Sequence, residues 1–286
     1  MNYNVFCDIL NKQIFDESKK DLLKKIANYP DRYVGLFRPT KPTAKVIQNL
    51  LQSHEIRFGN ALEILFEKYF RLLNYTVLDK SIVHNNESLA LDQLFKDGQF
   101  VYFVEQKVRD DHDSTKKCGQ IENFEKKINA LLDSYNEKKL KCFMYFIDPS
   151  LVKNRKYYNA VIEKMKSDYN IFIKLHYGQD FWEEIGHIEV WDEINSYLAR
   201  WKKNIPDIPS VNFDENAGDS FNEIKFLSVA IFRKLFDNKE ICSEILPIIS
   251  PEKKVLKLLL NFFKESSNKK SIYKSLAESI KRIIQV

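Results

Sequence analysis

The sequence predicts an α/β fold in which a mixed central β-sheet is flanked by helices, with N-terminal helices and a helical C-terminal region. Apolar residues with helical spacing dominate both ends of the 286-residue chain. Between these ends, a hairpin is followed by short strand-like runs, rich in aromatic and β-branched residues, that alternate with helical patterns. A hairpin pairs antiparallel strands and helical crossovers join parallel ones, so the sheet should contain both kinds of neighbour.

The N-terminal part of the chain, residues 1–54, is predicted to be helical with one irregular loop. Apolar spacing indicates one or two amphipathic helices over residues 4–28, and three prolines mark a loop over residues 30–42. A helix is expected after this loop, and a longer helix after Gly59.

The core of the protein, residues 55–201, is expected to supply the sheet. In chain order, strands are predicted at residues 75–83, 88–95 and 100–108, a helix at 116–135, a strand at 141–147, a helix at 154–169, a strand at 170–176 and a helix at 181–201. Asp97-Gly98 predicts a two-residue turn in which Lys96 pairs with Gln99.

The C-terminal part begins with a predicted linker over residues 202–220, which contains two prolines and a glycine. Residues 221–286 are predicted to be helical, in segments at 221–237, 250–266 and 271–284.

The composition excludes several classes of protein. Hydrophobic residues make up 44% of the chain and charged residues 30%, so most of it can fold around a core. Neither Gly-rich phosphate-loop motif occurs, which argues against a nucleotide-binding fold. The four cysteines form no CxxC pair and indicate reduced thiols in a cytoplasmic protein. No secretory signal and no apolar run of membrane-spanning length is visible.

Side-chain alternation along the strand at 100–108 gathers charged residues on one face. Phe103, Glu105 and Lys107 share a face, and the two-residue turn places Asp92 opposite Phe103, diagonal to Glu105. Gln106 points to the opposite face. Burying such charges is costly unless they are paired or bind a metal. The pattern therefore allows two interpretations: a salt bridge at a strand edge, or a metal-dependent catalytic site.

These residues carry a family resemblance. Asp92, followed after a hairpin by Glu105-Gln106-Lys107, resembles the Asp…(Asp/Glu)-x-Lys signature of the PD-(D/E)xK nuclease superfamily. The charged segment after this strand, and the order of elements over roughly residues 55–190, resemble the core of type II restriction endonucleases. The chain departs from the pattern at Leu91, where the family usually has proline.

The resemblance implies a Mg²⁺-dependent, sequence-specific endonuclease of a restriction-modification system, with 5′-phosphate and 3′-hydroxyl products. Asp92, Glu105 and Lys107 would be catalytic, and carboxylate oxygens suit Mg²⁺. The implied metal ligands are Asp92, Glu105, Gln106 and Glu63. For Glu63 the alternative is a solvated helix glutamate. A cognate DNA methyltransferase would protect host DNA without forming a stable complex. A repair or nicking nuclease and a non-catalytic DNA-binding module stay as alternatives.

Double-stranded DNA is the implied partner, and basic residues are concentrated near the predicted site. The whole chain carries a net charge of +5, whereas residues 138–174 alone contain nine Lys or Arg and three Asp or Glu. The candidate DNA-binding residues are Arg109, Lys116, Lys117, Gln120, Lys153, Arg155 and Lys156. A solvated lysine-rich face is the alternative, and Gln120 could be an ordinary polar residue at a helix start.

Cleavage of both strands needs two active sites or one site that acts twice. A homodimer would match the two-fold symmetry of a palindromic site, and the helices over residues 221–286 could form its interface. Alternatively, these helices clamp DNA or pack against the core of a monomer.

Overall fold

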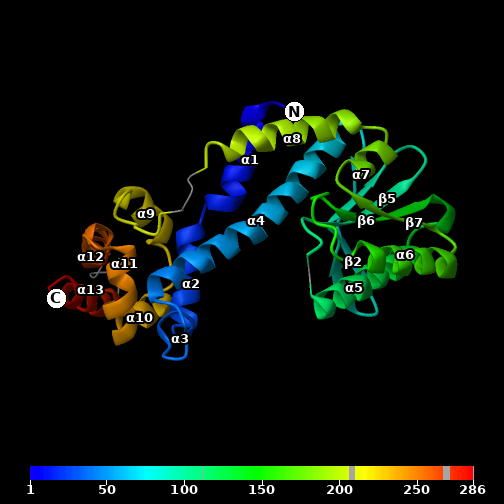
Figure 1. Ribbon diagram of the computed structural model, residues 1–286. Helices are drawn as coiled ribbons and strands as arrows, with labels where there is room; N and C mark the ends of the chain where they lie inside the picture. The colour runs from blue at the N-terminus through cyan, green and yellow to red at the C-terminus, as the bar shows by residue number, and fades with distance from the viewer. Residues whose placement is uncertain (112, 206–209, 267–270, 286) are drawn as a thin grey trace. The chain divides into compact units, whose positions relative to one another are not determined.

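The computed structural model describes residues 1–111, 113–205, 210–266 and 271–285 of the chain, which divides into two compact units. Unit 1 consists of Met1–Leu10 with Gly59–Ile205, and unit 2 of Asn11–Phe58 with Pro206–Val286. The division falls inside two helices, α1 (Tyr3–Phe15) and α4 (Pro42–Leu72), which Figure 1 labels. Because α4 continues through Gly59, the two helices predicted around that residue are one.

Unit 1 is built around a five-stranded mixed sheet with the strand order β1-β4-β5-β6-β7. The strands are β1 (Thr76–Val77), β4 (Gln93–Lys96), β5 (Val101–Lys107), β6 (Leu140–Phe146) and β7 (Phe172–Tyr177). β1, β4 and β5 are antiparallel neighbours, whereas β5, β6 and β7 are parallel. The predicted mixed sheet is therefore confirmed, and with it the restriction-endonuclease-like fold class.

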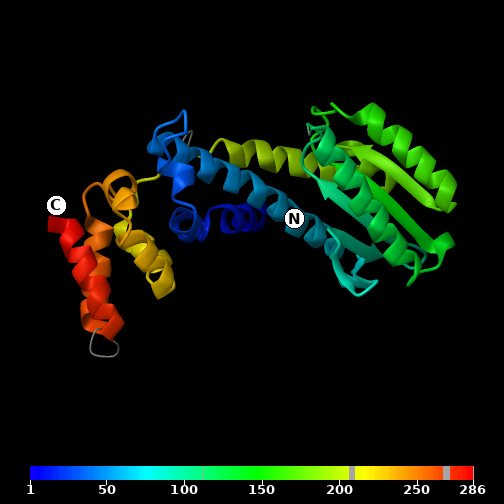
Figure 2. The ribbon, with the colours of Figure 1, turned by 90° about the horizontal axis from the view of Figure 1, so that it is seen from below.

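Helices cover both faces of this sheet, because its central strands are apolar on both sides. Besides α4, the helices of unit 1 are α5 (Ser114–Leu132), a 3₁₀ turn (Glu137–Lys139), α6 (Arg155–Tyr169), α7 (Gln179–Glu184) and α8 (Ile188–Lys202). α5 and α6 lie along one face (Figure 2) and share an apolar cluster with Phe103 and Met144. On the other face, Phe70 of α4 stacks on Phe95 at 3.9 Å between ring centroids.

The turn between β4 and β5 is longer than predicted. Lys96 pairs with Val101 and not with Gln99. The carboxylate of Asp97 accepts hydrogen bonds from the backbone N–H groups of Gln99 and Phe100, which closes a turn over residues 97–100. The predicted register is therefore wrong by two residues. Because side chains alternate with a period of two, each residue keeps its predicted face.

The two strands predicted before this turn are each divided in two. β2 (Ser81–His84) and β3 (Glu87–Ala90) form a separate two-stranded sheet. Asn85 and Asn86, which join them, have φ angles of 50° and 63°. Asparagine tolerates this left-handed backbone, which a tight hairpin turn requires. The two-residue turn thus lies here and not at Asp97-Gly98.

Unit 2 is helical in the residues that the structure describes. Besides parts of α1 and α4, it contains α2 (Ser18–Asn28), α3 (Asp31–Val34), α9 (Ala217–Ile224), α10 (Val229–Phe236), a π-helical turn (Ile241–Ile245), α11 (Leu246–Ile249), α12 (Lys254–Ser266) and α13 (Ser271–Gln285). The segment predicted as one helix over 221–237 is two helices, because the side chain of Ser228 caps α10. Residues 206–209 of the predicted linker lie outside the described residues.

Candidate active site

Two neighbouring strand ends carry the predicted catalytic residues. Asp92 immediately precedes β4, and Glu105 and Lys107 lie at the carboxyl end of β5. The observed register, in which Gln93 pairs with Val104, extends to place Asp92 directly opposite Glu105. This brings the two carboxylates closer together than the diagonal arrangement that the two-residue turn predicts.

The three side chains meet, and a fourth joins them. Lys107 Nζ lies 2.8 Å from Asp92 Oδ2 and 2.8 Å from Glu105 Oε1. Across from it, Lys127 Nζ of α5 lies 2.6 Å from Glu105 Oε2 and 3.9 Å from Asp92 Oδ1. Each carboxylate therefore contacts both ammonium groups. We call these four residues the charged cluster, in which two negative and two positive charges cancel.

One half of the charged cluster is buried and the other half is partly exposed. The side chains of Glu105 and Lys127 are 1% and 5% exposed, whereas those of Asp92 and Lys107 are 16% and 27% exposed. Burial opposes the charged form of Lys107, but the charges of Glu105 and Asp92 outweigh it and raise the pKa of its ammonium group. Lys107 is therefore positively charged at neutral pH, on the more exposed side of the cluster.

Lys127 is a site residue that the sequence analysis missed. It lies on the buried stripe of α5, between Phe124 and Leu131. A lysine is almost never buried without a partner, so its place in an apolar stripe was a usable signal. Asn123 of the same helix also reaches the cluster, with Nδ2 3.4 Å from Glu105 Oε1.

Gln106 and Glu63 lie beside the charged cluster. The backbone N–H of Gln106 donates to Asp92 Oδ2 at 2.8 Å, and its carbonyl accepts from Lys107 Nζ at 3.1 Å. Gln93 Nε2 donates to the carbonyl of Glu63 at 2.7 Å, which ties α4 to the hairpin. Burial, reinforced by the charge of Asp92, raises the pKa of Glu63 to about 7. The charges of the cluster thus act on the Glu63 carboxyl group.

The donor atoms at this point suit a hard divalent cation. Mg²⁺ prefers carboxylate and carbonyl oxygens and keeps several waters. Asp92, Glu105 and the carbonyl of Gln106 present such atoms together. Within the described ranges, no group of three or more His, Cys, Asp or Glu side chains gathers closely enough to hold a metal ion. A cation here would therefore depend on two carboxylates, a carbonyl and water, in a position that already attracts two ammonium groups.

The predicted DNA-binding residues come together at the starts of two helices. These residues are Lys116, Lys117 and Gln120 at the start of α5, and Lys153, Arg155 and Lys156 at the start of α6. Both helices follow adjacent parallel strands, so both begin at the sheet edge that carries the charged cluster. Lys117 Nζ lies 4.5 Å from the ring centroid of Tyr157. Gln120 Oε1 accepts a 2.7 Å hydrogen bond from Tyr158, whereas Asn123 is the residue that contacts Glu105.

Asp110 fixes the loop that carries the second basic group. It is fully buried, and its carboxylate accepts from the backbone N and Nδ2 of Asn154 at 3.0 and 2.9 Å and from the Tyr177 hydroxyl at 2.8 Å. Its carbonyl accepts from Lys153 N at 3.1 Å. Arg109, the preceding residue, has 43% of its side chain exposed. The segment after β5 thereby holds the start of α6 in place.

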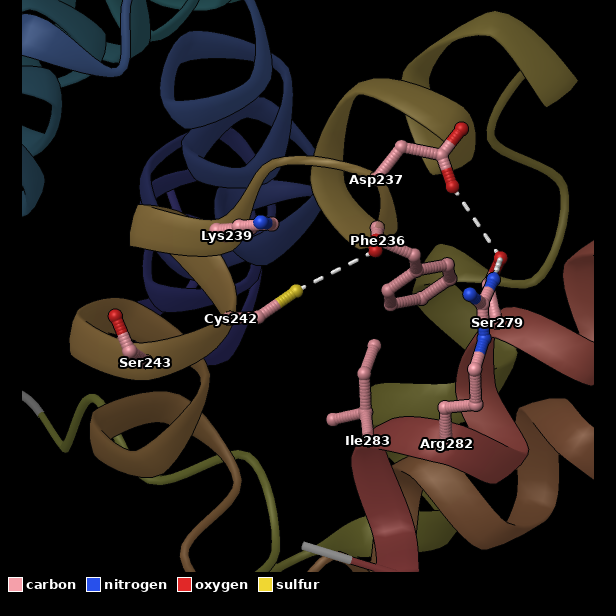
Figure 3. Close-up of a pocket in the computed structure, with 8 residues that line it drawn as sticks. All are labelled: Phe236, Asp237, Lys239, Cys242, Ser243, Ser279, Arg282 and Ile283. Carbon is pink, nitrogen blue, oxygen red and sulfur yellow. Dashed lines mark hydrogen bonds between the residues drawn. The ribbon is translucent and has the colours of Figure 1, made fainter.

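A separate hollow of about 630 Å³ lies in unit 2, between α10, the following π-helical turn and α13 (Figure 3). Its lining residues are Phe236, Asp237, Lys239, Cys242, Ser243, Ser279, Arg282 and Ile283. Ser279 Oγ donates to Asp237 Oδ1 at 3.2 Å and accepts from Arg282 at 3.1 Å. Among these lining residues there is no pair of carboxylates comparable to Asp92 and Glu105, so the charged cluster is the better candidate for an active site.

Comparison with known proteins identifies the family. The model of a family described as type II restriction endonuclease, HinfI, matches residues 66–202, a little under half of the chain. Residues 66–202 belong to the HinfI family of type II restriction endonucleases. A search of curated proteins and a search of solved structures gave no match.

The family of residues 66–202 implies a site-specific deoxyribonuclease that binds double-stranded DNA. This family assignment favours an enzyme over the non-catalytic DNA-binding module that the sequence left open. The matched segment contains the whole charged cluster and both basic helix starts, and it begins just after Glu63. Among the helices that the structure describes, none combines the length and the apolar character needed to cross a membrane.

Proposed function

We propose that the restriction endonuclease hydrolyses DNA phosphodiester bonds at the charged cluster, with Mg²⁺, to give 5′-phosphate and 3′-hydroxyl ends. The observation that carries this proposal is the convergence of Asp92, Glu105 and Lys107 at the end of β5, with contacts of 2.8 Å. The proposal includes residues 55–201 as the catalytic core. It also includes a cognate methyltransferase that protects host DNA in the same cytoplasm.

The residues of the site have distinct roles in this proposal. Asp92, Glu105 and the carbonyl of Gln106 hold the cation, with Glu63 as a further carboxyl group nearby. When bound, the cation polarises the scissile phosphate and lowers the pKa of the attacking water. The ammonium group of Lys107 orients the phosphate or the water and offsets the negative charge that develops in the transition state.

The basic starts of α5 and α6 would hold the DNA backbone beside this site. Phosphate contacts supply much of the affinity of a nuclease for DNA, and the N–H groups at a helix start add to them. Arg109 lies between the charged cluster and these helices along the chain. These backbone contacts would not select a DNA sequence, because base recognition needs contacts with base edges in a groove.

Plasmid digestion with and without Mg²⁺ tests the catalytic assignment. We expect discrete fragments only with Mg²⁺, and Asp92→Asn, Glu105→Gln and Lys107→Met should each reduce cleavage by roughly 100-fold or more. Lys126→Met is the matched control, because Lys126 is an exposed lysine on α5 whose ion-pair partner is Glu87. Cleavage at the wild-type rate by any folded catalytic variant would refute the assignment.

We also propose that two copies of the chain act on one duplex, because each copy brings one charged cluster and the duplex has two strands. The apolar faces of α12 and α13 are used inside unit 2, where Leu256, Phe263 and Ile280 are buried. These helices therefore stabilise their own unit, and the contact between copies would use another surface. Sedimentation should give two chains per cognate duplex. One chain per duplex, with nicked intermediates in digests, would contradict the dimer.

A further inference from the structure

We propose that Lys127 holds the place of the divalent cation between Asp92 and Glu105 in the free protein, so that a metal ion must displace an internal ammonium group in order to bind. This inference rests on the proposed function, because it assumes that these two carboxylates are the metal ligands. It assigns to a buried helix residue a control over metal binding.

Each of the two lysines contacts one oxygen of Asp92 and one oxygen of Glu105. Lys107 Nζ contacts Asp92 Oδ2 and Glu105 Oε1, and Lys127 Nζ contacts the other oxygen of each carboxylate. A cation that bridges the two carboxylates through one oxygen of each would therefore lie within a few ångströms of at least one of these ammonium groups.

The geometry indicates that Lys127 is the group that gives way. Lys107 Nζ has short contacts to both carboxylates and a third to the carbonyl of Gln106, at 2.8, 2.8 and 3.1 Å. Lys127 Nζ has one short contact, at 2.6 Å to Glu105, and its distance to Asp92 is 3.9 Å. The bridge that Lys127 forms is thus open on the Asp92 side, which is also the more exposed side of the cluster.

Charge makes this displacement necessary. The charged cluster is neutral with both lysines in place, so an incoming divalent ion would meet two positive charges within a few ångströms. The Lys127 side chain is 5% exposed, and an ammonium group that leaves the carboxylates needs a new anionic partner. The metal should therefore bind weakly to the free protein, and more tightly once the lysine is removed.

The test is Mn²⁺ binding to the full chain without DNA, followed by the electron paramagnetic resonance signal of the free ion. Lys127→Met should bind Mn²⁺ more tightly than the wild type by about tenfold or more, because a like charge at contact distance is gone. Lys127→Arg, which keeps the charge, and Lys126→Met, which removes an exposed charge from the adjacent position, should stay close to the wild type. Lys127→Gln provides a second neutral variant with the same expected gain, should Lys127→Met fail to fold.

Two outcomes separate this inference from the proposed function. If Asp92→Asn abolishes Mn²⁺ binding while the neutral Lys127 variants bind no more tightly than the wild type, the metal site stands and the role of Lys127 is refuted. If Asp92→Asn leaves Mn²⁺ binding unchanged, the carboxylates are not the metal ligands and the proposed function itself fails. Gains as large in Lys126→Met as in Lys127→Met would show a general charge effect and also refute the inference.

Discussion

Neutralising the basic start of α6 tests whether it holds the DNA backbone. Lys153, Arg155 and Lys156 are exposed in the free protein. Each cation that neutralises one phosphate adds about 0.9 to the slope of log K against log salt concentration, so three full contacts would add about 2.7. Arg155 lies 3.9 Å from Asp180, which reduces its share. We therefore expect the slope to fall by about 2 to 2.7 when all three are changed to glutamine.

Fluorescence anisotropy of a labelled non-cognate duplex, without divalent metal, measures this slope. Over a fourfold rise in salt concentration both proteins lose affinity for DNA. If the slope of the variant is smaller by about 2.7, its loss of affinity is about 40-fold smaller than that of the wild type. A matched control changes Lys138, Lys139 and Lys164 to glutamine. It removes the same charge from exposed positions at the amino end of β6 and further along α6. A wild-type slope in the first variant, or an equal decrease in the control, would refute a phosphate-binding role for this helix start.

Two further predictions concern the stability of unit 1, whose unfolding in urea can be followed by tryptophan fluorescence because all three tryptophans lie in it. Asp110→Ala removes the carboxylate that accepts three buried hydrogen bonds, two from Asn154 and one from Tyr177, so we expect a loss of about 3–5 kcal/mol in the free energy of unfolding. Asp111→Ala should cost less than about 1 kcal/mol, and equal losses would contradict the structural role of Asp110. Burial lowers the pKa of His176 below its ordinary value of 6.5, so the folded state takes up a proton less readily than the unfolded state. The stability of unit 1 should therefore fall as the pH drops below that value, and an unaltered pH profile in His176→Phe would contradict this.

The sequence was sufficient to predict which carboxylates meet, although the predicted turn was wrong. Asp97 closes a longer turn through its own side chain, and the pairing moves by two residues. Face assignment depends only on odd or even position, so an error of two residues leaves Asp92 and Glu105 on the same side. An error of one residue would have separated them. The turn that Asp97 closes thus determines how far apart the two carboxylates lie. The alternation of side chains along the strands determines that both lie on the same face of the sheet.

The contacts made across long stretches of chain were beyond sequence reasoning. Lys127 reaches Glu105 only because α5 packs on the β5 face, and Asp110 meets Tyr177 only because β5, β6 and β7 are neighbours. Periodicity shows which side of an element is buried. It does not show which buried group on another element faces it, so both partners had to come from the structure.

The charged cluster is neutral as a whole, and this affects whether DNA or the metal ion would bind to the enzyme first. A bare acidic pair would repel the DNA backbone at short range, and such a site would need its ion before it could accept DNA. Here two lysines already balance the acidic pair. A duplex could therefore slide past the strand end while the protein carries no ion, and scanning for a target would be independent of the ion supply. Scission would follow only where the backbone stays long enough for an ion to enter.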